Sequence, residues 1–229
     1  GWISISGIVN THFIGSYLLM KFGTEEQKQK YLPKAASGEC ILAIGMTEPS
    51  GGSDLAALKT TAVRDGDEWV INGQKVWTTS AHKAQWGLLL ARANWDVAKH
   101  KGLAYFILDM KQPGVQVHPL KQMNGHASFN QVFFNDAIVE PEMLVSEVGD
   151  GWTVATTTLM HERFTLAFGL QLQVQITLRQ LVDKAKASRG ADGSPASADP
   201  VIRQKLAQLM IEAGRHDVVV TGGMESMSH

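Results

Sequence analysis

Small polar residues gather in one short stretch that could hold an anion. The first segment, residues 45–54, reads GMTEPSGGSD and follows the apolar run CILAI. Pro49 blocks helix propagation there, and Gly51 and Gly52 permit positive φ angles. Backbone N–H groups around the two glycines could form an anion-binding concavity, to which the Ser53 hydroxyl adds a donor. The spacing matches neither a P-loop nor GxGxxG, and an ordinary polar turn is the plainer interpretation.

A second segment, residues 77–80, carries an aromatic side chain beside hydroxyl groups. Trp77 is followed there by Thr78, Thr79 and Ser80. An indole next to hydroxyl donors suits a flat heteroaromatic ring. The alternative is that Trp77 belongs to the core and that the threonines reflect strand propensity. Together, the two segments predict a site for a dinucleotide with a large ring system.

A carboxylate stands on an apolar helix face within LMHERFTLAFG. Glu162 shares that face, by i, i+3 and i+4 spacing, with Leu159 and Leu166. Burial on such a face suits a general base. Arg163 comes next, where it could pair with the carboxylate or hold an acyl-thioester ligand. A solvated glutamate is the plainer interpretation.

The elements that must position these residues are strands flanked by helices. Residues 1–38 show helix-like apolar spacing, with Thr24 as a helix cap and Gln27 at the capping-box position. From 39 to about 145, about seven short apolar runs alternate with turn signals, which predicts an antiparallel sandwich or barrel. Within this region, Asn72-Gly73 predicts a type I′ hairpin.

Helix returns in the last third of the chain. One long helix is predicted over about 152–188, with basic residues near its C-terminal end. A flexible linker follows. Asp199 then caps a helix that Pro200 opens and Gly214 ends. The final stretch reads as a β-branched run and a glycine turn, so the chain as a whole is predicted to be an α+β protein.

Composition excludes several classes of protein. The 229 residues are 44% hydrophobic and 19% charged, and 21 basic and 22 acidic residues give a net charge of −1. This balance gives no support to nucleic-acid binding, and the apolar runs are shorter than a membrane span. The single cysteine, Cys40, excludes an intramolecular disulfide and suits a reducing compartment. With no signal peptide and no metal-ligand pattern, we expect a bacterial cytoplasmic protein, or a mitochondrial matrix protein in a eukaryote.

Most of the chain resembles the acyl-CoA dehydrogenase family of flavoproteins. The stretches FGTEEQKQKYLPKAASGE, GMTEPSGGSD, INGQKVWTTSA, KQPGVQV and GDGWTVATTTLMHER occur in the family's order and spacing, over roughly 22–213. The resemblance implies part of a helical N-terminal domain over 1–38 and an antiparallel β-barrel middle domain over 39–147. Part of a helical C-terminal domain would span 148–213.

The resemblance implies an FAD site built from the two segments. Thr47 and the Met46 backbone would contact the isoalloxazine edge. Ser53 would face the FAD pyrophosphate and the acyl-CoA. Trp77 would cover the ring, and Thr79 would hydrogen-bond near N5. The full set of implied cofactor-binding residues is Ile44, Met46, Thr47, Ser53, Trp77, Thr78 and Thr79.

The implied reaction is α,β-dehydrogenation of an acyl-CoA thioester to trans-2-enoyl-CoA, with electrons passing to an electron-transfer flavoprotein. A subset of the family carries the catalytic base where Glu162 stands, whereas many members carry it later in the C-terminal domain. Ser53, His161 and Arg163 would line the substrate. Because family members are usually dimers or tetramers, a homo- or hetero-oligomer is expected.

The last residues, 214–229, resemble a thiolase segment, GGMESMS, from a different fold that handles related CoA thioesters. No cysteine follows Cys40, so the thiolase nucleophile is not expected. We therefore expect a composite chain joined near 213–214 and incomplete at both ends relative to the family. Two other functions stay open: a non-catalytic remnant that binds flavin or acyl-CoA, and an acyl-transfer protein related to thiolase.

Overall fold

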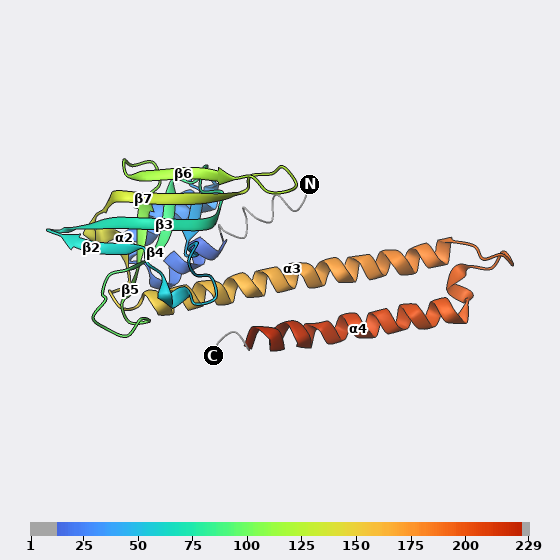
Figure 1. Cartoon of the computed structure of the whole chain (residues 1–229). Helices are drawn as coiled ribbons and strands as arrows, with labels where there is room; N and C mark the ends of the chain where they lie inside the picture. The colour runs from blue at the N-terminus through green and yellow to red at the C-terminus, as the bar shows by residue number, and fades with distance from the viewer. Residues whose placement is uncertain (1–12, 226–229) are drawn as a thin grey trace. The chain divides into compact units, whose positions relative to one another are not determined.

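The computed structural model describes the backbone of residues 13–225 and the side chains of 13–162 and 171–213. The chain forms two compact units, Gly1–His161 and Glu162–His229. The first unit holds the strands and the N-terminal helices, and the second holds most of the two long C-terminal helices (Figure 1).

Two helices precede the sheet. Residues 13–22 form the first, and α2 spans Glu25–Ser37. The Thr24 hydroxyl accepts the Gln27 N–H at 3.2 Å, and the Gln27 side chain accepts the Thr24 N–H at 3.1 Å. The predicted capping box is therefore confirmed. Gly38, in the left-handed conformation at φ 77°, closes the helix.

The predicted apolar runs all form strands, and one further short strand follows them. Strand order in the single sheet is β6-β7-β3-β2-β4-β5-β8, with β1 paired to β4. The strands are β1 (Leu42–Gly45), β2 (Thr61–Asp65), β3 (Glu68–Thr79), β4 (Trp86–Arg92), β5 (Leu103–Asp109), β6 (Val115–Leu120), β7 (Phe129–Val139) and β8 (Leu144–Val145).

The sheet differs from the predicted antiparallel barrel in two ways. Strand β1 runs parallel to β4, and β2 meets β4 in a parallel pair at Thr61 and Arg92, so the sheet is mixed. The strand order ends at β6 and at β8, and the sheet is not closed. A barrel needs a continuous ladder through its first and last strands. The barrel detail of the prediction is therefore not confirmed.

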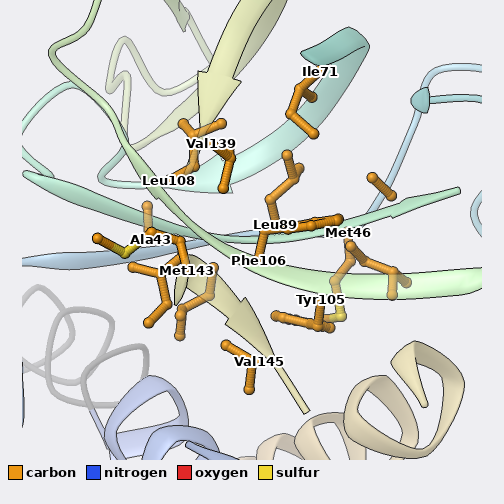
Figure 2. Packing of buried hydrophobic residues seen from close by; sticks show 14 of the residues in the cluster. Ala43, Met46, Ile71, Leu89, Tyr105, Phe106, Leu108, Val139, Met143 and Val145 are labelled. Carbon is orange, nitrogen blue, oxygen red and sulfur yellow. The ribbon is translucent and has the colours of Figure 1, made fainter. Parts of the chain in front are cut away.

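The core lies on the central strands β4 and β5. Their residues are almost continuously buried, as expected for strands covered on both faces. Figure 2 shows side chains of several strands directed into this interior, among them Leu89, Phe106 and Val139. The Trp69 and Phe106 ring centroids lie 5.4 Å apart. Helix α2 is fixed to β8 because the Gln27 amide donates to the Leu144 carbonyl at 2.9 Å.

The Asn72-Gly73 hairpin prediction is wrong. Both residues lie inside β3, at a register shift against β7. The Asn72 amide donates to the Asp136 carboxylate at 2.8 Å, and the Asp136 N–H donates back to Asn72 at 2.9 Å. A Cβ on Gly73, at φ 147°, would lie 2.7 Å from Thr60 Cα. Glycine is therefore required by a bulge and a close backbone approach. The β2–β3 turn lies instead at Gly66-Asp67.

Two long helices end the chain. Helix α3 spans Gly151–Ala187, close to the predicted bounds, and α4 spans Pro200–Glu225. The Asp199 carboxylate accepts the Val201 N–H at 2.7 Å, which confirms the predicted cap. Helix α4 continues through Gly214, so the predicted helix end there is wrong. The predicted β-branched run and glycine turn are also wrong, because residues 218–220 and 222–223 lie within α4. Residues 226–229 lie outside the described residues.

The connection between α3 and α4 is a hydrogen-bonded turn, whereas the sequence predicts a flexible linker. The Gly190 N–H donates to the Ser194 carbonyl at 2.8 Å. The Asp192 carboxylate accepts both the Ser194 hydroxyl, at 2.7 Å, and its N–H, at 3.0 Å. Local Asx geometry thus orders a stretch rich in small residues. None of the helices described here is both long and apolar enough to cross a membrane.

Candidate functional site

Backbone pairing brings the two predicted segments together. The first segment begins at the end of β1, and the second begins near the end of β3. The Val76 N–H donates to the Thr47 carbonyl at 2.9 Å. This bond places Thr47 beside the residue that precedes Trp77. The structure therefore juxtaposes the β1 end of the first segment with the β3 end that carries the second.

The first segment runs from the interior to the surface. Met46 is buried, Ile44 and Thr47 are half-buried, and Ser53 is exposed. The Gly51 N–H donates to the Glu48 carbonyl at 3.2 Å, and the Glu48 N–H donates to the Gly51 carbonyl at 3.4 Å. Because the Gly51 N–H is used inside this turn, the predicted anion concavity has one donor fewer than the sequence suggested.

Trp77 lies at the surface in an unusual backbone conformation. Its side chain is 58% exposed and its φ is 60°, in the left-handed region that bulky residues rarely adopt. The Phe129 ring meets it edge to face at a centroid distance of 5.8 Å. A register shift between Lys75 and Thr78 accompanies this bulge. The interpretation of Trp77 as a core residue is therefore wrong.

The two threonines after Trp77 differ in their surroundings. Thr79 is half-buried, whereas Thr78 is only 3% exposed. Within the described part of the chain, the Thr78 hydroxyl has no hydrogen-bond partner. Thr78 is one of the residues that line a small cavity, together with Gly45 and Lys75. The Thr78 carbonyl accepts the Asn130 amide at 2.9 Å. Thr78 thus belongs to the interior side of the bulge.

A buried ion pair joins the two segments, and sequence reasoning missed it. Lys75 Nζ lies 2.8 Å from Glu48 Oε1, with the two side chains 0% and 4% exposed. The ammonium also donates to the Met46 carbonyl at 3.0 Å. A signal was present: Lys75 is in phase with the inward-facing Trp69 and Ile71 along β3, and an inward lysine needs a carboxylate partner.

Glu48 is better satisfied than Lys75. Its Oε2 accepts the Lys59 N–H at 2.7 Å, and its Oε1 accepts the Thr60 N–H at 2.9 Å. Burial alone would raise the pKa of Glu48, but the Lys75 ammonium and these donors hold that pKa below its usual value. Burial lowers the pKa of Lys75 to about 8, against the opposing effect of Glu48. Both groups are therefore mostly charged at neutral pH.

Two further cations hold the rest of the stretch between β1 and β2. The buried Arg92 guanidinium donates to the Ala56 carbonyl and, at 3.4 Å, to the Leu58 carbonyl. Lys99 Nζ lies 2.8 Å from the Asp54 carboxylate, where both side chains are at least half exposed. The stretch that contains Ser53 is therefore fixed from β3, from β4 and from the β4–β5 connection.

The predicted base and its neighbours lie on α3. His161 is half-buried, and its ring centroid lies 3.7 Å from that of Tyr17. Glu162 is half-buried and begins the second unit. Arg163 has a helical backbone, and its side chain lies outside the described residues. The roles of Glu162 and Arg163 therefore rest on their sequence motif. Among the side chains that are described, no cluster of three His, Cys, Asp or Glu residues could hold a metal ion.

Comparison with known proteins identifies the family. Family models for the acyl-CoA dehydrogenase N-terminal, middle and C-terminal domains match residues 1–39, 43–137 and 149–228 in chain order. The chain therefore belongs to the acyl-CoA dehydrogenase family, whose members are FAD-binding flavoprotein oxidoreductases of fatty acid metabolism. The predicted enzyme class is confirmed. The thiolase resemblance of 214–229 stays a prediction.

Individual relatives agree with this assignment. Acyl-CoA dehydrogenase IpdE1 of Mycobacterium tuberculosis is 43% identical over 190 residues, which are 83% of this chain and 48% of that relative. A solved steroid acyl-CoA dehydrogenase variant, Tcur3481-Tcur3483 G363A, superimposes with a TM-score of 0.79 at 34% identity, over 96% of this chain and 55% of that one. Butyryl-CoA dehydrogenase of Megasphaera elsdenii gives 0.81 at 26% identity, over 96% and 57%. The chain spans about half the length of these proteins.

Proposed function

We propose that this chain carries the flavin-binding part of an acyl-CoA dehydrogenase that converts an acyl-CoA thioester to trans-2-enoyl-CoA. The observation that supports this most is the meeting of the two polar segments, in which the Thr47 carbonyl accepts the N–H of Val76, the residue before the exposed Trp77. Both segments resemble the family's flavin stretches, and both lie within residues 43–137, which the middle-domain family model matches.

The residues present fit an isoalloxazine ring. An indole that is 58% exposed and fixed by a bulged backbone offers a flat apolar surface. Two half-buried threonines add hydroxyl groups. Thr79 lies two residues after Trp77, and the Thr47 carbonyl accepts the N–H of the residue before Trp77. The half-buried Ile44 and the buried Met46 add apolar side chains to the same segment. Because the Thr78 side chain is buried, Thr78 would contribute to the site through its backbone only.

When bound, FAD supplies the acceptor for the substrate hydride. Trp77 would limit the movement of the ring and exclude water from one side. Thr79 would hold the ring edge near N5, and Ser53 would position the pyrophosphate and the acyl-CoA. These roles are alignment roles, which lower the barrier by holding the reactants in register.

Glu162 is the proposed base that removes the α-proton of the thioester. It stands directly before Arg163, as in the subset of family members that carry the base on the first long C-terminal helix. His161 and Arg163 would line the substrate end. Removal of the α-proton of an oriented thioester by a carboxylate would be general-base catalysis.

The proposed setting follows from the relatives. Several relatives of 41–47% identity come from mycobacteria, which supports a bacterial protein. The cytoplasm is its proposed location. An electron-transfer flavoprotein is the proposed electron acceptor, and an oligomer of two or four chains is the proposed assembly. The steroid acyl-CoA dehydrogenase among the similar structures makes steroid acyl-CoA thioesters a substrate class to test beside straight-chain ones.

The substitution Glu162→Gln tests the base. We expect FAD binding to be retained and enoyl-CoA formation to fall by at least about 100-fold, since general-base catalysis contributes about two to four orders of magnitude. Asp183→Asn, which lies farther along α3, is the matched control and should keep parent activity. Full dehydrogenation by Glu162→Gln would contradict the assignment of the base.

A further inference from the structure

We propose that the buried Glu48–Lys75 pair positions both flavin-facing segments. In this role, the pair holds the start of the first segment against β3 and thereby fixes the peptide at residues 46–47 relative to Trp77. The expected effect on FAD binding rests on the proposed function, whereas the fixing of the first segment against β3 is independent of any cofactor.

The Lys75 ammonium connects β3, which carries the second segment, to two groups of the first segment. Lys75 Nζ donates to Glu48 Oε1 at 2.8 Å and to the Met46 carbonyl at 3.0 Å. Both acceptors belong to the first segment, whereas Lys75 itself stands two residues before Trp77 on β3. Movement of the Lys75 side chain would therefore change the separation of the two segments.

The carboxylate closes the stretch between β1 and β2. Glu48 lies at its beginning, and the Lys59 and Thr60 N–H groups that it accepts lie at its end. Ser53 lies within the closed stretch. Three donors on one carboxylate leave it little freedom to rotate, so the ends of the stretch are held at a fixed separation.

Peptide geometry transmits the constraint to Thr47. The Met46 carbonyl is directed at Lys75 in the interior. In a planar trans peptide, the following N–H points opposite to that carbonyl. The Thr47 N–H is therefore directed away from Lys75, while the Thr47 carbonyl is held by the Val76 N–H at 2.9 Å. The ion pair thus sets the direction of a backbone donor beside the proposed ring site.

Stability does not explain the pair. Both side chains are almost fully removed from water, and such pairs are often replaced by apolar residues without loss of stability. The exposed Lys99–Asp54 pair holds the same stretch without this burial cost. A buried pair is instead suited to fixing one arrangement, because only one geometry satisfies all its hydrogen bonds.

The deciding variant is Glu48→Gln/Lys75→Met, in which no buried charge is left without a partner. We expect thermal stability close to the parent. Amide hydrogen exchange over 46–60 and at Val76 in the FAD-free protein should accelerate about tenfold, and the FAD dissociation constant should rise about tenfold, the effect of one buried hydrogen bond. Val139→Ala, which makes a cavity on β7 opposite Trp69, is the control for general destabilisation. It should lower the melting temperature and leave the FAD dissociation constant unchanged.

The outcomes separate the two proposals. Parent-like local exchange and an FAD dissociation constant within about twofold of the parent in the folded double variant would overturn the positioning role. A parent that binds no FAD overturns the proposed function, and the exchange measurement then still tests the pair alone. If the double variant does not fold, Lys75→Arg decides, because it keeps the charge and moves the donors: weaker FAD binding supports the role, and unchanged binding overturns it.

Discussion

Trp77 and Thr78 are adjacent residues with opposite environments. The indole is exposed on a strained backbone, while the Thr78 hydroxyl is buried. A strained, exposed aromatic contributes little to folding, and such strain is often found at ligand-binding sites. The two side chains therefore give separable predictions.

Substitution of Trp77 tests the ligand role. Trp77→Ala should weaken FAD binding by about three- to tenfold, because aromatic contacts contribute roughly 0.5–1.5 kcal/mol beyond their buried area. The free energy of unfolding should change by less than about 0.5 kcal/mol, as at other exposed positions. FAD titration and urea unfolding measure the two effects. Trp95→Ala, which removes an indole that is 60% exposed, is the control and should leave FAD affinity intact.

Substitution of Thr78 tests the interior role. Thr78→Val removes a buried hydroxyl that has no partner among the described residues and should raise the free energy of unfolding by about 1 kcal/mol. Thr158→Val is the matched control. It removes a hydroxyl that donates to the Val154 carbonyl at 2.8 Å and should lower stability. A loss of stability on Thr78→Val would show that this hydroxyl has a partner.

Acid stability tests the Glu48 environment. The pKa of Glu48 is lowered in the folded chain. The unfolded state therefore binds more protons as pH falls below about 4.5, and the stabilisation is lost as pH falls through the folded pKa. Urea unfolding between about pH 5.5 and 3 should show a flatter pH dependence for Glu48→Gln/Lys75→Met than for the parent. Parallel curves would contradict the lowered pKa of Glu48.

At the scale of elements, the first of the two register shifts in β3, between Ile71 and Gly73, depends on one glycine. Gly73→Ala would place a Cβ 2.6 Å from Thr60 Oγ1 and should cost about 3 kcal/mol, through strain and overpacking. Gly66→Ala is the matched control, since Gly66 also has positive φ but has no atom within 4 Å of a Cβ. It should cost about 1–2 kcal/mol. Equal melting temperatures for the two variants would contradict the close approach of Thr60.

Local patterns predicted the elements well, and distant contacts explain the errors. The Thr24 capping box and the Asp199 cap depend on neighbours within three residues, so the sequence revealed both. Asn72-Gly73 failed as a hairpin signal because its conformation is set by Thr60 and Asp136, which are far away in the chain. Strand order and the parallel β1–β4 pair likewise depend on contacts that periodicity does not encode.

The same limit applies to the site. Motif resemblance indicated both polar segments, and the Thr47–Val76 hydrogen bond shows that they meet. The Glu48–Lys75 pair was missed because its members are 27 residues apart and each looks like an ordinary surface charge. Only the inward phase of Lys75 along β3 distinguished it. Burial of a charged side chain thus depends on tertiary contacts, and the alternation of inward and outward residues along a strand indicates it only weakly.

At the scale of the whole molecule, the chain has two units, and the proposed flavin-binding residues and the proposed base lie in different units. The first, Gly1–His161, contains both polar segments, and the second, Glu162–His229, begins at the proposed base. The family assignment spans both units, since the C-terminal-domain match covers 149–228. The proposed base therefore belongs to the second unit, whereas the proposed flavin-binding residues all belong to the first.

The most direct test is an anaerobic titration of the purified chain, reconstituted with FAD, by a panel of straight-chain and steroid acyl-CoAs. We predict that FAD binds and that at least one acyl-CoA bleaches the visible flavin absorption while enoyl-CoA forms. Colourless protein that still binds acyl-CoA would contradict the account and support a non-catalytic acyl-CoA-binding remnant. A bound flavin that no acyl-CoA of the panel reduces would contradict the proposed reaction.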